Sequence, residues 1–295
     1  MYKISIFSLL LFMTIFSYPT AQDLKTFGET YLDPTTYIPG IDPDINMYIS
    51  SWTESMPYHT HGSLVERDIL TKGDPVKPVK KGGVLKFVNR FTRASLASYT
   101  TTTPTTLKGE QEIIYILSGN GLIKAGTKTD DLYPGITVLV PANLEFTVKN
   151  TADKDLTMYL VSEPVPADFK PNSELIVKDE SALPVSKGGH WCHEVVTLLT
   201  SMDGLAEVEN VLVVSIPPMS IAHPHAYPAG QEEVWTAVEG TSIAFLGKQI
   251  RIQPPGTAFK VPPDGKFIHS NINQSKEQVK FFYFFRTPEH NLYKK

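Results

Sequence analysis

The sequence predicts an all-β protein made of two copies of one β domain. After residue 22 the apolar residues fall in short β-branched and aromatic runs that end at Gly, Pro, Asn or Asp, and no useful stretch has the helical period. The 23 prolines outnumber the 19 glycines, which favours short strands and turns over long helices. The third observation is an internal repeat whose parts follow the same order in both halves.

The predicted strands are the apolar runs themselves, and they occur in both halves of the chain. The clearest runs are Glu112–Leu117, Thr137–Val140, Leu156–Val161, Val211–Ile216, Val234–Val238 and Lys280–Phe285. Each is of ordinary strand length and is followed by residues typical of turns.

The repeat pairs segments from the first half of the chain with segments from the second. The matches are Ser63–Asp68 with Glu174–Asp179, Gly109–Gly119 with Gly230–Gly240, Tyr133–Pro141 with Pro254–Pro262, and Leu156–Val161 with Lys280–Phe285. A proline-rich joint lies near residues 163–172. We therefore expect an N-terminal barrel with an N-terminal arm over residues 22–165 and a C-terminal barrel over residues 166–295, preceded by a signal peptide over residues 1–21.

Composition limits the classes of function. The chain has 27 Lys plus Arg and 31 Asp plus Glu, a net charge of −4, and no Lys/Arg-rich block, so we expect no nucleic-acid partner. A single cysteine, Cys192, excludes an intramolecular disulfide framework and a multi-cysteine zinc site. The 295 residues suggest about two domains, which agrees with the repeat.

The first residues have the layout of a secretory signal peptide. Lys3 precedes an apolar run over residues 4–16, and small or polar residues with one proline lead to Ala21. The run is too short for a convincing membrane span. We expect cleavage after Ala21, a secreted or periplasmic mature chain, and no stable membrane insertion after cleavage.

Candidate metal ligands gather in the second copy. His223 and His225 stand at positions i and i+2, so on a strand both imidazoles point to one face. Glu233 opens the apolar run that predicts the next strand, and His269 follows further along. Three neutral imidazoles and one carboxylate inside a barrel form a nitrogen and oxygen site that suits one divalent ion of Mn, Fe, Ni, Cu or Zn.

These residues resemble the two motifs of the cupin superfamily. The first motif is read at His223, His225, Glu233 and Gly240, with the usual six-residue gap from Glu to Gly and a longer gap between His225 and Glu233. The second is read at residues 256–273, with one extra residue in each of two gaps. The resemblance implies two tandem jelly-roll barrels over nearly all of the mature chain. It also implies that His223, His225, Glu233 and His269 are the metal ligands.

The first copy has lost most of this set. Thr102 and Pro104 stand where the repeat places the two histidines, and Phe146 replaces the third, whereas Glu112 remains. A lone carboxylate cannot hold a borderline divalent ion tightly, so we expect no metal there and only a structural, interface or pocket role. In the second copy Glu232 competes with Glu233 as a ligand, but the spacing to Gly240 and the match to Glu112 favour Glu233.

A second string, His59-Thr-His61 followed by Glu66, also satisfies the first motif. Nothing like the second motif follows it until a segment that the repeat assigns elsewhere. We read residues 45–70 as a strand before the first barrel, and His59 and His61 as a solvated loop pair. The alternative is that this arm crosses to the other barrel and lines its pocket.

Other side chains are weaker candidates for chemistry. In the segment His190-Trp-Cys-His193, strand alternation places His190 and Cys192 on one face, and either histidine could serve as an acid or base. Cys192 lacks a visible activating environment for a nucleophile. Tyr227 is a further candidate beside the metal motif. Trp235 and Phe259 are read as barrel wall.

Three classes of function remain open. The first is a metal-dependent enzyme acting on a small organic molecule, as a dioxygenase, isomerase, lyase or hydrolase, with the ion as Lewis acid or oxygen activator. The second is a module that binds a sugar or metabolite without turnover. The third is a storage or structural bicupin, which retention of all four ligands disfavours. Expected partners are a small-molecule ligand and, as an option, further copies of the chain in a homo-oligomer.

Overall fold

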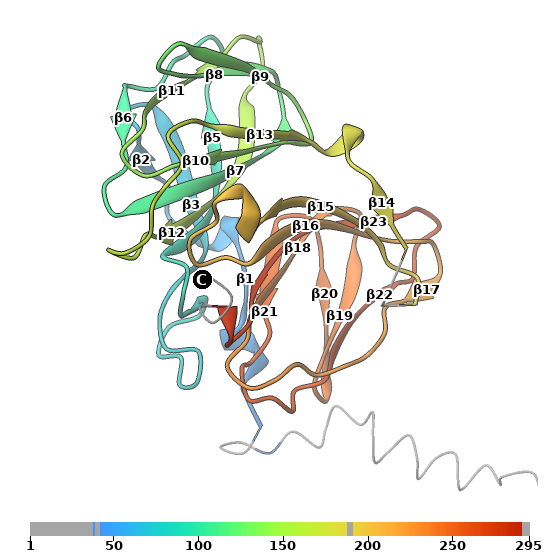
Figure 1. Ribbon diagram of the computed structural model, residues 1–295. Helices are drawn as coiled ribbons and strands as arrows, with labels where there is room; N and C mark the ends of the chain where they lie inside the picture. The colour runs from blue at the N-terminus through green and yellow to red at the C-terminus, as the bar shows by residue number, and fades with distance from the viewer. Residues whose placement is uncertain (1–37, 39–41, 188–190, 291–295) are drawn as a thin grey trace, which may run out of the picture.

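The computed structural model describes residues 38, 42–187 and 191–290, and these form four antiparallel β-sheets arranged as two barrels (Figure 1). The predicted fold class, all-β with two tandem jelly-roll barrels, is confirmed. The predicted signal peptide and His190 lie outside the described residues.

The N-terminal barrel consists of one larger and one smaller sheet. The larger sheet has the order β13 (Ile176–Asp179), β10 (Ile136–Val140), β7 (Glu110–Ser118), β12 (Leu156–Pro164), β5 (Arg90–Leu96), β3 (Leu64–Lys72) and β2 (Tyr58–Thr60), with β4 (Gly83–Leu85) parallel to β3. The smaller sheet has the order β6 (Thr105–Thr106), β11 (Glu145–Asn150), β8 (Gly121–Ala125) and β9 (Lys128–Leu132).

The C-terminal barrel repeats this plan. Its larger sheet has the order β1 (Ile49–Ser51), β21 (Thr257–Lys260), β18 (Glu232–Glu239), β23 (Val279–Arg286), β16 (Asn210–Ile216), β15 (Glu194–Thr200) and β14 (Val185–Ser186). Its smaller sheet has the order β17 (Ser220–Ile221), β22 (His269–Asn273), β19 (Ser242–Leu246) and β20 (Gln249–Gln253).

The helices of the described residues are short 3₁₀ turns. They are η2 (Ile45–Met47), η3 (Trp52–Glu54), η4 (Glu180–Ala182) and η5 (Ser201–Asp203). Among the described residues, no helix has the length and apolar character needed to cross a membrane.

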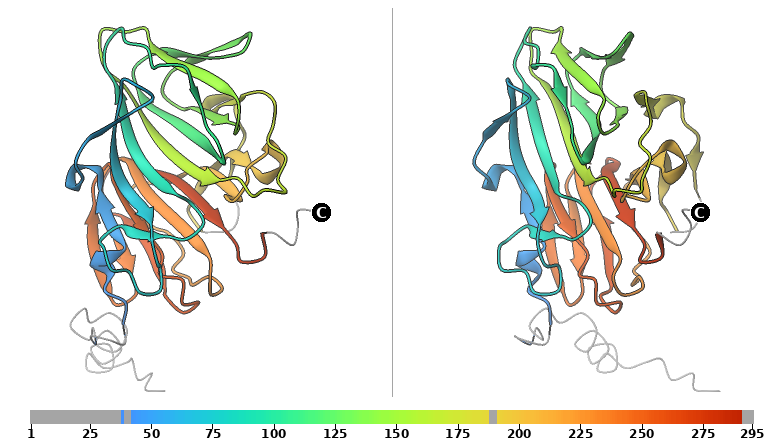
Figure 2. Two further views of the ribbon diagram at one scale, coloured as in Figure 1. Left: turned by 90° about the vertical axis from the view of Figure 1, so that its left-hand side faces the viewer. Right: turned by 60° about the vertical axis from the view of Figure 1, so that its left-hand side comes forward.

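Each larger sheet contains one edge strand from the other half of the chain. β1 belongs to the N-terminal arm but pairs with β21, with Ile49 opposite Phe259. β13 follows the proline-rich joint but pairs with β10. Figure 2 shows the blue N-terminal segment beside the orange strands of the C-terminal barrel. The arm therefore does cross to the other barrel, but with residues 49–51, while His59 and His61 stay with the first barrel.

This exchange corrects one part of the repeat. Ser63–Asp68 lies largely in β3, between β5 and β2, whereas Glu174–Asp179 ends in the edge strand β13, so the two segments occupy different places. The counterpart of β13 and η4 is β1 and η3. The matched asparagines do agree: the Asn150 and Asn273 amides each donate to three backbone carbonyls, in the same arrangement.

The two larger sheets face each other and bury a shared core. Phe282 of β23 contacts Tyr115 and Tyr159 of the N-terminal barrel, with ring centroids 5.0 and 5.8 Å apart. Phe91 of β5 packs edge-on against Phe284 at 5.4 Å. All five rings are almost fully buried. The barrels are thus joined by an apolar layer of the kind found inside a single domain.

Two buried carboxylates, one from each barrel, accept hydrogen bonds from the backbone of the other barrel. Glu232 of β18 accepts hydrogen bonds from the backbone N–H groups of residues 86–88 in the other barrel. Glu163 of β12 accepts them from residues 206–208. In both cases burial raises the carboxyl pKa, against the lowering effect of the hydrogen bonds. Glu232 therefore has a structural partner on the side of the sheet opposite to Glu233.

Candidate metal centre

Three of the four predicted ligands meet inside the C-terminal barrel. His225 follows β17, Glu233 lies on β18 and His269 begins β22, and their ligand atoms all lie within 4.8 Å of one another. The backbones of His225 and His269 pair as an antiparallel bridge, with N–H to O distances of 3.2 and 3.0 Å. Glu233 and His269 are each about 1% exposed. The elements of both sheets thus converge on one buried donor group.

Neighbouring groups orient these side chains. Nδ1 of His225 lies 2.6 Å from the carbonyl oxygen of His223, which directs Nε2 toward the cluster. The indole N–H of Trp235 donates to Oε1 of Glu233 at 2.6 Å. Oε1 also lies 3.1 Å from Nε2 of His269. The carboxylate is therefore fixed from one side and faces the imidazoles on the other.

His223 lies beside this group and is not among the three. Its ring is stacked on that of His225, with centroids 5.7 Å apart and planes at 9°, and it contacts the exposed indole of Trp191 at 5.0 Å. The side chain is half-buried. The structure thus brings three predicted ligands together and places the fourth one ring further toward the surface.

The site is electrostatically prepared for a cation. Burial would raise the pKa of Glu233, but the His269 imidazole and the Trp235 hydrogen bond outweigh it and hold the pKa below its usual value. Burial and the Glu233 charge together raise the pKa of Tyr227 and of Tyr283. Both phenols therefore stay protonated near neutral pH. Tyr227 lies edge-on to His225 at 4.6 Å.

The donor set fits a borderline divalent ion. Two imidazoles and one carboxylate supply nitrogen and oxygen ligands of the type that Mn, Fe, Ni, Cu and Zn share. Nδ1 of His269 is buried without a hydrogen-bond partner, and few buried polar groups are left so in folded proteins. A cavity of about 10 Å³, the scale of one water molecule, is bordered by Tyr227, Gln231, Glu233 and Phe267.

The weaker candidates lie at differing distances from this group. The His193 ring is buried against Trp235, with centroids 5.7 Å apart, so it is one side chain away from Glu233. Tyr227 contacts His225 directly. The thiol of Cys192 lies 3.2 Å from the backbone carbonyl of Ile221 and is partly exposed. Among the described residues, no hydrogen bond or ion pair joins the thiol to a basic side chain that would activate it as a nucleophile.

The equivalent place in the N-terminal barrel is filled with charged groups. His61 is not a solvated loop residue: its side chain is 6% exposed and its Nε2 lies 3.4 Å from Oε2 of Glu112. The expectation that Glu112 lacks an imidazole neighbour is therefore wrong. His59 is exposed as expected. The N-terminal arm turns back along β3 after β2, and this brings His61 into the barrel although it lies 51 positions before Glu112.

Arg90 is the central cation of that barrel. Its guanidinium lies 2.9 Å from Glu112, 3.4 Å from Glu110 and 3.7 Å from Glu66. The strand registers also change which residues of the first barrel correspond to the two histidines. Thr105 opposes Phe146 in the first barrel in the same way that His225 opposes His269 in the second. The counterparts of the two histidines are thus Thr103 and Thr105, one residue later than Thr102 and Pro104.

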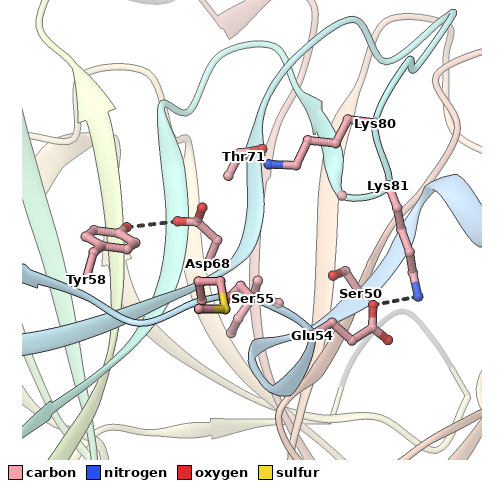
Figure 3. Close-up of a pocket in the computed structure, with 11 residues that line it drawn as sticks. Ser50, Glu54, Ser55, Tyr58, Asp68, Thr71, Lys80 and Lys81 are labelled. Atoms are coloured by element: carbon pink, nitrogen blue, oxygen red, sulfur yellow. Dashed lines mark hydrogen bonds and ion pairs between the residues drawn. The ribbon is translucent and has the colours of Figure 1, made fainter.

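A larger cleft of about 520 Å³ lies away from both barrel interiors, between η3, β3 and the turn at residues 80–82 (Figure 3). Its two carboxylates are engaged: Glu54 with the Lys81 ammonium at 2.6 Å, and Asp68 with the Tyr58 hydroxyl at 2.8 Å. No histidine lines it. It therefore does not compete with the C-terminal barrel as a metal centre.

No protein-family model matches the sequence, and no curated protein matches it either. Solved structures do match. A protein from Pseudomonas aeruginosa described as glyoxylate-induced has a TM-score of 0.65 at 13% identity, over 87% of this chain and 96% of that one. A variant of oxalate decarboxylase from Bacillus subtilis has a TM-score of 0.64 at 10% identity, over 83% and 78%. Protein Ylba from E. coli has a TM-score of 0.56 at 17% identity, over 78% and 93%. At these identities the likeness is one of fold.

Sequence reasoning missed two residues near the two sites and misread a third. Tyr283 was predicted only as part of a strand, yet burial and the Glu233 charge raise the pKa of its hydroxyl. Arg90 belongs to a segment without a motif match in the repeat, and His61 was interpreted as part of a solvated loop. The signal that was available is the alternation of β23, which places Tyr283 on the same face as the core residue Phe281.

Proposed function

We propose that the C-terminal barrel holds one divalent transition-metal ion and acts on a small organic molecule at that centre. His225, Glu233 and His269 would bind the ion. The observation that carries the proposal is the convergence of the ligand atoms of these three side chains within 4.8 Å of one another inside the barrel. His223 is the proposed fourth ligand, because it stands two residues before His225 in the motif and its ring lies next to that of His225, with centroids 5.7 Å apart.

The ion, when bound, supplies a Lewis acid or an oxygen activator at an open coordination position. The protein groups around it set the conditions for this chemistry. Trp235 fixes the Glu233 carboxylate, and the His223 carbonyl holds His225 in the tautomer whose Nε2 faces the cluster. The protonated phenols of Tyr227 and Tyr283 can donate hydrogen bonds to an anionic ligand.

Small carboxylic acids are the first substrates to test. The names of two structural neighbours refer to oxalate and to glyoxylate. A metal ion with protonated phenols beside it suits an anion. A binding module without turnover remains the second reading of the same site and takes the same ligands.

The test combines metal content with turnover. The mature chain is purified, its metals are measured by elemental analysis, and oxalate and glyoxylate consumption is followed with and without dioxygen. We expect about one ion per chain and metal-dependent loss of one of the acids. Stoichiometric binding without turnover would favour the binding module, and a metal-free chain with undiminished turnover would overturn the proposal.

We further propose that the mature chain begins near Gln22 and is exported. The support is the order of Lys3, the apolar run over residues 4–16 and Ala21. Mass spectrometry of the N-terminus from the extracytoplasmic fraction decides the matter. An intact Met1 in the cytoplasmic fraction would contradict it.

A further inference from the structure

The outer face of the smaller sheet in the C-terminal barrel is apolar. Ala244 and Leu246 of β19 point inward and belong to the barrel core, so the alternate residues of β19 point outward. The same holds for the neighbouring strands. The outward apolar residues of this sheet are Ile221, Ile243, Phe245, Ile250, Ile252 and Ile272. We call this surface the apolar outer face.

Four of these residues form one unbroken row across the sheet. Ile221 opposes Ile272, Ile272 opposes Ile243, and Ile243 opposes Ile252, so the row runs through β17, β22, β19 and β20. Phe245 and Ile250 oppose each other in the next row. Ile252 is 61% exposed and Ile250 is 53% exposed. No described segment of the chain covers the end of the row at β20.

The N-terminal barrel supplies an internal control for this face. Its corresponding row runs through Thr101, Lys149, Leu122 and Asp131. In the next row Lys124 opposes Thr129, where the C-terminal barrel has Phe245 opposite Ile250. The two sheets share strand order and register, so the fold does not require apolar residues here. A second requirement must account for them in one barrel alone.

We propose that the apolar outer face is the interface of a two-fold symmetric homodimer. The six side chains carry no charge, so a second copy related by two-fold symmetry places apolar atoms on apolar atoms without like-charge contact. The cations at the rim are already engaged within the chain: Lys248 binds Asp42 at 3.0 Å, and Arg251 donates to Asn46 at 3.1 Å. The surface thus offers a charged partner nothing to complement.

The dimensions of the face also suit a second copy. Strands about 4.8 Å apart and residues about 3.3 Å long give three strands of five residues and one of two a footprint of roughly 270 Å². This is the scale of a fully buried interface centre, which a polar rim extends to about 800 Å² per partner in a stable homodimer. Two such faces would pack as the sheets of a β-sandwich do.

The proposal is tested by light scattering and sedimentation of the full mature chain over a concentration series. We expect a dimer at micromolar concentration. Ile243→Lys places a charge at the centre of the row on both copies and should weaken dimerisation by about 100-fold or more. Ile252→Lys changes the exposed edge strand, where the fold tolerates a lysine, and should also weaken dimerisation. Leu122→Lys changes the matching position of the N-terminal barrel and should leave the dimer intact.

Amide hydrogen exchange at low and high concentration locates the contact. Protection that rises with concentration in β19 and β20, and not in β8 and β9, supports the proposal. Thermal unfolding and metal content of each variant show whether the fold and the proposed centre survive, which separates this proposal from the preceding one. A wild-type chain that stays monomeric, even where the face binds detergent or another protein, overturns it. So does a dimer that persists in Ile252→Lys.

Discussion

Glu112 and Glu233 occupy the same position in the two barrels but face different cations. Glu233 faces the imidazoles of His225 and His269, and no arginine or lysine forms an ion pair with it among the described residues. Glu112 faces the guanidinium of Arg90 at 2.9 Å and the imidazole of His61. A buried carboxylate must be matched by positive charge or by hydrogen bonds. One barrel meets this need with a resident guanidinium, and the other with an indole N–H and imidazoles.

The neighbouring positions differ in the same sense. In the first barrel Glu112 opposes Ser162, and Ser162 opposes Arg90. In the second barrel Glu233 opposes Phe285, and Phe285 opposes Asn210. Asn210 therefore stands at the position that Arg90 has in the first barrel. The registers also place Val195 where the first barrel has Glu66. The first barrel therefore holds a closed ion network and the second an apolar wall around an open donor group. A retained glutamate alone does not indicate a retained metal site.

The largest expected effect is on the first barrel. Arg90→Met leaves Glu66 and Glu112 buried without their main cation and should lower the free energy of unfolding by about 4 kcal/mol. Metal content of the C-terminal barrel should not change. Chemical denaturation and elemental analysis of the same sample measure both. Loss of the metal in this variant would show that the two barrels share one centre.

The next effect compares the reciprocal carboxylates of the interface. Glu163→Ala and Glu232→Ala each leave three backbone N–H groups at the interface without their acceptor, and each should cost about 3 kcal/mol. Because the two arrangements mirror each other, the two losses should be similar. Denaturant unfolding of each variant measures them. A cost confined to one carboxylate would mean that only one barrel depends on the contact.

Removal of one metal ligand should separate function from fold. His225→Ala should weaken metal affinity by more than about 100-fold, because losing a ligand costs more than losing a group that only hydrogen-bonds to a ligand. The unfolding temperature should fall by a few degrees at most. Glu112→Gln is the matched control and should keep its metal. Undiminished metal in His225→Ala would refute the ligand assignment.

The smallest effect is a pH dependence in the first barrel. Burial lowers the pKa of His61, but the Glu112 carboxylate outweighs it, and the net pKa lies above the ordinary value of 6.5. The contact therefore stabilises the fold below about pH 6.5 and is lost as the pH rises through the higher folded-state value. As the pH rises from about 6.5 through the folded-state pKa of His61, the free energy of unfolding of the wild type should fall relative to that of His61→Gln. His59→Gln, which alters the exposed neighbour, should follow the wild type.

The sequence was sufficient for the fold because strand-length apolar runs, broken by turn residues, recur in the same order. The motif also singled out His225, Glu233 and His269, which the structure brings together because each lies at or beside the end of a strand of the same barrel. The sequence also held an unused signal at Glu232. Adjacent residues of one strand point to opposite faces, so only one of two neighbouring glutamates can face the barrel interior.

The rest depended on contacts that leave no local pattern. β1 and β13 are three and four residues long, and such short edge strands carry too little periodicity to reveal their partners. His61 and Arg90 reach Glu112 only through the turn after β2 and the pairing of β5 with β12. His223 shows the limit of motif transfer, since its ring is stacked outside the group that it was predicted to join.

The exchange of edge strands has a consequence for the order of folding. β1 is the first strand of the part of the chain that the structure describes, but its partner β21 begins only at Thr257, more than 200 residues later. The C-terminal sheet therefore cannot be completed before synthesis is almost finished, and closing so long a loop slows the last step. We expect fragments cut at residue 165 to leave both halves with an open sheet edge, and such edges promote aggregation.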